Sequence, residues 1–134
     1  MENRNILIDT NIIIDFLRKQ NKQQSYLWRI KEANFNCIIS TITAFELYAG
    51  AISSKHKEDL KKLFKWLDVQ PFTIKIAKIS AEIYKDLKSK NQLIEFRDIF
   101  IGATAIQIDI PLLTQNEKHF TRIKGIRIYD IQSI

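Results

Sequence analysis

Glycine and proline are scarce in this chain, which contains 3 Gly and 2 Pro among 134 residues. This scarcity excludes linkers and low-complexity tracts and favours helices joined by short connections. The sequence also lacks any run of about 18 or more apolar residues, the length that a membrane-spanning helix needs. The N-terminus carries no basic stretch followed by a cleavable apolar segment, so we expect no export signal and no membrane association.

Cysteine is almost absent as well, because Cys37 is the single one in the sequence. It cannot form an internal disulfide. Its apolar neighbours, Ile38 and Ile39, predict a reduced, buried thiol in a cytoplasmic protein.

Acidic residues are in the minority: 15 Asp and Glu stand against 21 Lys and Arg, which gives a net charge of +6. A positive net charge favours a polyanionic partner, and nucleic acid is the first candidate. A lysine-rich composition that serves only solubility is the alternative.

The apolar content is sufficient for one domain, because 46% of the residues are hydrophobic, and residues 1–134 are expected to fold as a single unit. Apolar, β-rich runs predict strands at residues 5–8, 36–40, 69–72, 110–114 and 126–129. Apolar spacings of three and four predict helices around residues 12–17, 25–33, 41–51, 55–67, 74–87 and 98–108. Pro71 makes the third strand an edge or a strand end. Strands that alternate with helices indicate an α/β fold with a parallel central sheet sandwiched by helices.

Three acidic residues stand close to the predicted sheet or in apolar surroundings. Asp9 directly follows the apolar run at residues 6–8, so we expect its side chain at the carboxyl edge of the sheet, where α/β proteins bind ligands. Glu46 lies about one helical turn beyond the strand at 36–40, within reach of the same edge. Asp98 heads an almost wholly apolar helix.

Each acid also has an ordinary structural explanation. Asp9, Thr10 or Asn11 could cap the following helix, Glu46 could face solvent, and the helix dipole favours an acid such as Asp98 at a helix N-terminus. Three such acids at one edge would repel one another unless a cation lay between them. Mg²⁺ or Mn²⁺ held by a few carboxylates is the usual solution, and such an ion activates water and stabilises charge on a phosphoryl oxygen.

Four motifs in order give the chain a specific resemblance. They are Ile8-Asp9-Thr10-Asn11 with Ile14-Asp15-Phe16-Leu17, the run from Ser40 to Gly50, the run from Arg97 to Ala105, and Leu113-Thr114-Gln115-Asn116 with His119-Phe120. With these motifs the chain resembles PIN-domain ribonucleases, and among them the VapC toxins of bacterial and archaeal toxin–antitoxin pairs. The resemblance spans essentially the whole chain.

The resemblance implies that Asp9, Glu46 and Asp98 bind the metal and that Thr114 and Asn116 line the site as polar supports. It further implies a PIN-like fold, a homodimer and a cognate antitoxin protein. One position departs from the family pattern. Many relatives have a fourth acid at the position of Asn116 or near His119, whereas here Glu117 is the only carboxylate nearby. Glu117 is a supporting candidate for this reason, and Thr10 and Asn11 are supporting candidates beside Asp9. One well-bound ion is expected, with a second that arrives with the substrate.

Two basic residues next to the proposed ligands are candidates for contact with RNA phosphates: Arg97, beside Asp98, and Lys118, beside the missing fourth acid. His119 is more readily explained as a polar residue before the final strand, and His56 as solvated surface.

The function that these features predict is a Mg²⁺- or Mn²⁺-dependent endoribonuclease, the toxin of a type II toxin–antitoxin pair. Such an enzyme hydrolyses RNA phosphodiester bonds with a metal-activated water. A phospho-acceptor receiver domain is also α/β, but it needs an Asp at the end of the third strand, where this chain has Gln70-Pro71-Phe72. A degenerate PIN domain that binds RNA or a protein partner without cutting remains the alternative.

Overall fold

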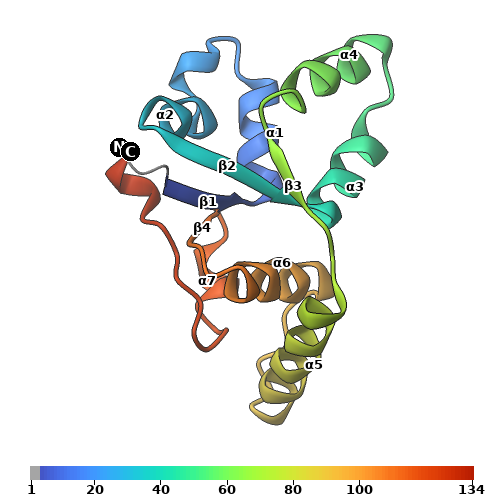
Figure 1. Ribbon diagram of the computed structural model, residues 1–134, viewed down its shortest axis with the longest axis vertical. Coiled ribbons are helices and arrows are strands. Elements are labelled where there is room, and N and C mark those ends of the chain that lie inside the picture. Colours follow the sequence, from blue (N-terminus) through green and yellow to red (C-terminus); the bar gives the residue numbers. More distant parts are fainter. Residues whose placement is uncertain (1–3) are drawn as a thin grey trace.

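Four parallel strands form the centre of the computed structural model, which describes residues 4–134 (Figure 1). The strands are β1 (Arg4–Ile8), β2 (Phe35–Ser40), β3 (Asp68–Gln70) and β4 (Leu112–Leu113). Their order across the sheet is β3-β2-β1-β4. The chain thus runs outward from β1 to β3 and then returns to the other side of β1, which makes the gap between β1 and β4 a topological switch point.

Seven α-helices accompany the strands in this part of the chain, and the predicted α/β sandwich is confirmed. They are α1 (Thr10–Arg18), α2 (Tyr26–Glu32), α3 (Thr41–Gly50), α4 (Ser54–Leu63), α5 (Ile74–Ser89), α6 (Phe96–Gln107) and α7 (Glu117–Phe120). Short 3₁₀ turns cover Lys22–Gln24 and Ile131–Ser133. Figure 1 shows α1, α2 and α4 over one face of the sheet and α5 and α6 over the other. None of the helices within residues 4–134 has the length and apolarity needed to cross a membrane.

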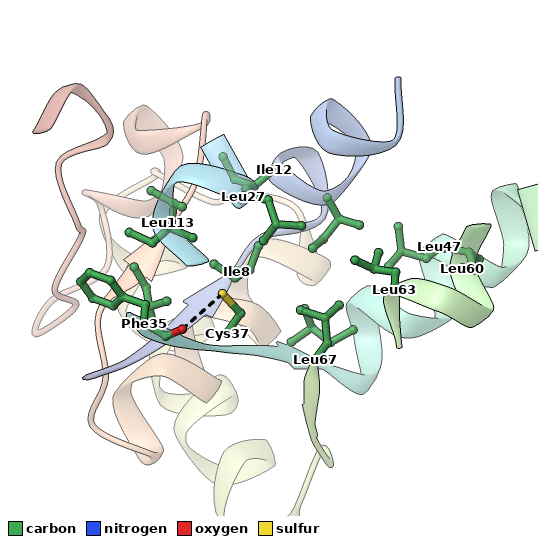
Figure 2. Close-up of a cluster of buried hydrophobic side chains, with 14 residues drawn as sticks. Ile8, Ile12, Leu27, Phe35, Cys37, Leu47, Leu60, Leu63, Leu67 and Leu113 are labelled. Carbon is green, nitrogen blue, oxygen red and sulfur yellow. Dashed lines mark hydrogen bonds between the residues drawn. The ribbon is translucent and has the colours of Figure 1, made fainter. Parts of the chain in front are cut away.

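The core consists of two apolar layers that the sheet separates. Successive residues of a strand point to opposite faces, so Ile6 and Ile8 join one layer and Leu7 joins the other, all with no exposed surface. Figure 2 shows the first layer, in which Leu27 of α2 and Leu63 of α4 lie over the sheet. Burial on both faces explains why the strand sequences are continuously apolar.

Two helices begin directly where a strand ends, without an intervening loop. The Asp9 carboxylate accepts a hydrogen bond from the Thr10 backbone N–H at 2.7 Å, and the Ser40 hydroxyl accepts one from Ile42 N–H at 3.0 Å. Each side chain satisfies an N–H group that the first helical turn leaves free. This capping fixes the starts of α1 and α3 at the carboxyl edge of the sheet.

Two sequence predictions are wrong in detail. The strand expected at 126–129 is reduced to a single bridge between Leu112 and Ile128, because β4 itself has only two residues to pair with. The helix expected to reach Leu67 ends at Leu63 and continues as tight turns. Leu67 nevertheless belongs to the buried core, and this burial explains why the apolar spacing extends beyond the helix.

Cys37 is buried in β2, with 2% of its surface exposed, as the sequence predicts. Burial raises the pKa of its thiol to about 12, an effect that the charge of Lys31 only partly offsets. Because the thiolate is the reactive form, we expect native Cys37 to react with Ellman's reagent at pH 8 far more slowly than the same residue in denaturant. Equal rates in the native and denatured protein would contradict the burial of this thiol.

Candidate functional site

The candidate site lies at the switch point, where the carboxyl ends of β1 and β4 meet. Asp9 directly follows β1 and is fully buried. Its backbone N–H donates to Leu113 O at 3.0 Å, and its Oδ2 accepts a hydrogen bond from the Thr114 hydroxyl at 2.7 Å. Asp9 therefore serves as the cap of α1 and also presents a charge at the sheet edge. The sequence offers a helix cap and a site acid as alternatives for Asp9, and the two roles are compatible.

Two further helices bring acids to Asp9. Glu46 lies on α3 and is half-buried, and its Oε1 accepts a hydrogen bond from the Thr10 hydroxyl at 2.6 Å. The same hydroxyl lies 3.0 Å from Thr43 Oγ1. Asp98 lies in the first turn of α6 with 2% of its surface exposed. Three elements far apart in the sequence thus supply the three predicted acids.

Arg97 joins these acids, because its guanidinium is paired with all three carboxylates. Its Nε lies 2.9 Å from Glu46 Oε2, and one terminal nitrogen lies 2.8 Å from Asp9 Oδ1 and 2.9 Å from Glu46 Oε1. The other terminal nitrogen contacts Asp98 Oδ1. A quarter of the Arg97 side chain is exposed, so the cluster opens to solvent on one side.

These contacts determine the charge states of Glu46 and Arg97. Burial favours the neutral form of Glu46, but hydrogen bonds from Arg97 and Thr10 outweigh burial and lower its pKa. Burial also disfavours the Arg97 cation, yet its hydrogen bonds and charge pairs with Glu46 and Asp9 raise its pKa. Both groups are therefore held in their charged forms at neutral pH.

A polar shell surrounds the acids on the β4 side. The backbone N–H of Asn116 donates to Thr114 Oγ1 at 2.9 Å, and the Asn11 side chain accepts a hydrogen bond from Gln115 N–H at 3.2 Å. The Asn116 amide lies 2.8 Å from His119 Nδ1, and that nitrogen lies 3.1 Å from Asp98 Oδ2. Thr114 and Asn116 therefore lie where the resemblance implies, while Asn11 connects α1 to the loop after β4.

The remaining candidates lie outside this cluster. Glu117, half-buried in α7, and Lys118, exposed beside it, make no side-chain hydrogen bond or ion pair with any residue in the range 4–134. Glu117 therefore does not take the place of the fourth family acid in this arrangement. His119, and not Glu117, lies next to Asp98.

Two contacts were not predicted from the sequence. The sequence predicts that Arg97 contacts RNA phosphates, whereas its guanidinium contacts the acids of its own chain. His119 was explained as a polar residue near a turn, whereas it contacts Asp98. The spacing in the sequence could have placed His119 in the site. It lies three residues after Asn116, and α7 brings the two side chains together.

The chemistry of these side chains fits a hard divalent cation. Carboxylate oxygens are the ligands that Mg²⁺ prefers, and the three carboxylates outnumber the one guanidinium by two charges. As the residues stand, no three Asp, Glu, His or Cys side chains among residues 4–134 are arranged to hold an ion directly. The Arg97 guanidinium lies between the carboxylates, which accounts for this arrangement.

A parallel α/β domain with carboxylates gathered at the switch point matches one known class. The PIN domain family matches residues 6–126, and the chain therefore belongs to this family. Within it, the chain belongs with the VapC ribonucleases. It is 36% identical over 132 residues to "Ribonuclease VapC1" of Methanocaldococcus jannaschii, a match that covers 96% of this chain and 90% of that one. It is 33% identical over 140 residues to "Ribonuclease VapC1" of Rickettsia felis, with 96% and 97% covered.

Solved structures show the same fold. DNA-bound VapBC from Salmonella typhimurium superposes with a TM-score of 0.83 at 25% identity, covering 96% of this chain and 98% of the other. VapBC2 from Rickettsia felis, bound to a promoter DNA fragment, gives a TM-score of 0.82 at 23% identity over 93% and 97% of the two chains. A toxin–antitoxin complex from Klebsiella pneumoniae shares the fold as well, with a TM-score of 0.73 at 26% identity over 90% and 94% of the two chains.

Proposed function

We propose that this protein is a Mg²⁺- or Mn²⁺-dependent endoribonuclease, the toxin of a type II toxin–antitoxin pair. The observation that carries this proposal is the convergence of Asp9, Glu46 and Asp98 on one cationic group. The named relatives are ribonucleases, which points to RNA as the substrate. The proposal includes action in the cytoplasm, where such an enzyme meets its RNA.

The protein's own residues prepare the site for hydrolysis. Thr114 and the backbone of Thr10 fix both oxygens of Asp9, and His119 contacts the outer oxygen of Asp98. When bound there, the metal ion would supply an activated water and neutralise charge that develops on the phosphate. Because Asp9 and Asp98 are buried, their fixed charges act in a weakly screened environment and hold a cation strongly.

Lys118 and the positive net charge would help to hold the RNA backbone. Lys118 is exposed and lies next to His119, and its ammonium group is free to approach a phosphate. The net charge of +6 adds a long-range attraction for a polyanion. These features support binding of RNA through phosphates and do not select a particular sequence.

Removal of the metal is expected to abolish cleavage of a mixed RNA pool, because the carboxylates alone supply no electrophile. The measurement compares RNA fragments formed with Mg²⁺, with Mn²⁺ and with EDTA, and restoration by excess Mg²⁺ is the control. Equal cleavage with EDTA would refute the metal mechanism. RNA binding without cleavage under every condition would favour the degenerate PIN domain.

The antitoxin and a second copy of the chain are the proposed protein partners. Three large apolar side chains on or just beyond α3 are exposed: Phe45 by 71%, Tyr48 by 61% and Ile52 by 84%. Other residues of the same segment, among them Leu47 and Ala51, line a cavity of about 210 Å³ between α1, α3 and α4. Such a surface supports a protein partner, because large apolar groups are costly to leave in water.

A further inference from the structure

The Arg97 guanidinium uses the same carboxylate oxygens that a metal ion would need. It contacts Asp9 Oδ1, both oxygens of Glu46 and Asp98 Oδ1. A further hydrogen bond of 3.1 Å joins it to Thr10 Oγ1. A guanidinium bound in this way and a divalent cation cannot both hold these oxygens, so the two compete for one site.

We propose that Arg97 competes with the divalent cation for the three acids. Arg97 pairs with the carboxylates and offsets part of their charge before the ion binds, and it leaves them when the ion binds. This inference rests on the proposed metal-dependent function and adds a step to it. Arg97 thereby has two states, one paired with the acids of its own chain and one released from them.

The need for such a residue follows from burial. The side chains of Asp9 and Asp98 are 0% and 3% exposed, so their charges would repel each other strongly without a counterion. Arg97 supplies that counterion and stabilises the metal-free protein. The carboxylates retain two excess negative charges even with Arg97 in place, so a divalent cation is still attracted.

The position of Arg97 also allows it to leave. It lies in the first turn of α6, and a quarter of its side chain already faces solvent. Once a divalent cation is bound, like charge repels the guanidinium from the acids. The released group remains beside Asp98 at the mouth of the site, and a guanidinium is well suited to bidentate contact with a phosphate. Arg97 would then pair first with the acids and afterwards with an RNA phosphate.

The test measures Mn²⁺ binding by calorimetry in the wild type and in Arg97→Gln, which removes the competing charge and keeps a polar side chain. Arg127→Gln is the matched control, because Arg127 is paired with the exposed Asp109, in a separate ion pair outside the site. We expect Arg97→Gln to bind Mn²⁺ at least about 10-fold more tightly than the wild type, because the unpaired site no longer has to be freed. Arg127→Gln should bind like the wild type.

Equal or weaker Mn²⁺ binding by Arg97→Gln would overturn the competition and leave the metal site standing. If neither the wild type nor Arg97→Gln binds Mn²⁺, the competition and the proposed metal-dependent function both fail.

A second measurement uses the wild-type fold and so does not depend on how the variant folds. The Nε–H group of Arg97 donates to Glu46, and its NMR signal can be assigned through the bonded carbons of the Arg97 side chain in the wild-type protein. This signal should shift or vanish as Mg²⁺ saturates the protein. A signal that stays unchanged at saturating Mg²⁺ would overturn the proposal.

Discussion

Asp9→Asn is expected to lower the rate of RNA cleavage at least about 100-fold. Loss of a residue that only orients a metal ligand already lowers metal affinity or activity about 10–100-fold, and Asp9 is proposed as a ligand itself. An amide carries no charge and holds a divalent cation poorly. The measurement is the initial rate of fragment formation from a labelled RNA at saturating Mg²⁺.

The fold of this variant should survive. An asparagine can keep its oxygen toward the Thr10 N–H and turn its NH₂ group to the Thr114 hydroxyl, which can accept as well as donate. The matched control is Asp86→Asn, which removes the same charge from an exposed pair with Lys90 on α5. If Asp9→Asn retained more than a tenth of the wild-type rate while Asp86→Asn behaved normally, Asp9 would not be a metal ligand.

Phe120→Ala is expected to lower the free energy of unfolding by about 3–5 kcal/mol, the usual cost of truncating a buried phenylalanine. Phe120 has no exposed surface and fills the layer between α7 and α6. A Cβ placed on Gly102 of α6 would lie 3.7 Å from its ring, an ordinary contact distance, so the ring packs against α6 at this glycine.

Urea denaturation gives this free energy, and Phe45→Ala is the matched control. Phe45 is 71% exposed, so its truncation should change the free energy of unfolding by no more than about 0.5 kcal/mol. Equal losses for the two variants would show that Phe120 does not carry the packing assigned to it.

Much of the fold could be predicted because local patterns agree with the tertiary structure. Continuous apolar runs marked β1 and β2, since both faces of a covered parallel strand are buried. Ser25, Ser40 and Ser53 mark helix starts, because each caps the helix that follows. Asp9 is predictable for the same reason, since a charge directly after a buried strand must emerge at its carboxyl edge.

The contacts within the site could not be predicted, because they join residues far apart in the sequence. Arg97 reaches Asp9 across 88 positions and Glu46 across 51. Only the folded chain decides whether its guanidinium turns inward to acids or outward to RNA. The strand predicted at residues 126–129 does not form for a related reason: these residues have the composition of a strand, but β4 offers only two residues as partners.

The two outer strands of the sheet are short, and this limits how copies of the chain can join. β3 has three residues and is followed closely by Pro71, which has no N–H to donate. On the other side, the Leu112–Ile128 bridge already covers β4. Neither edge offers a row of free backbone groups that could recruit a foreign strand, so both edges resist amyloid-like growth. If two copies of this protein associate, we expect them to do so through side chains and not by extending one sheet across two subunits.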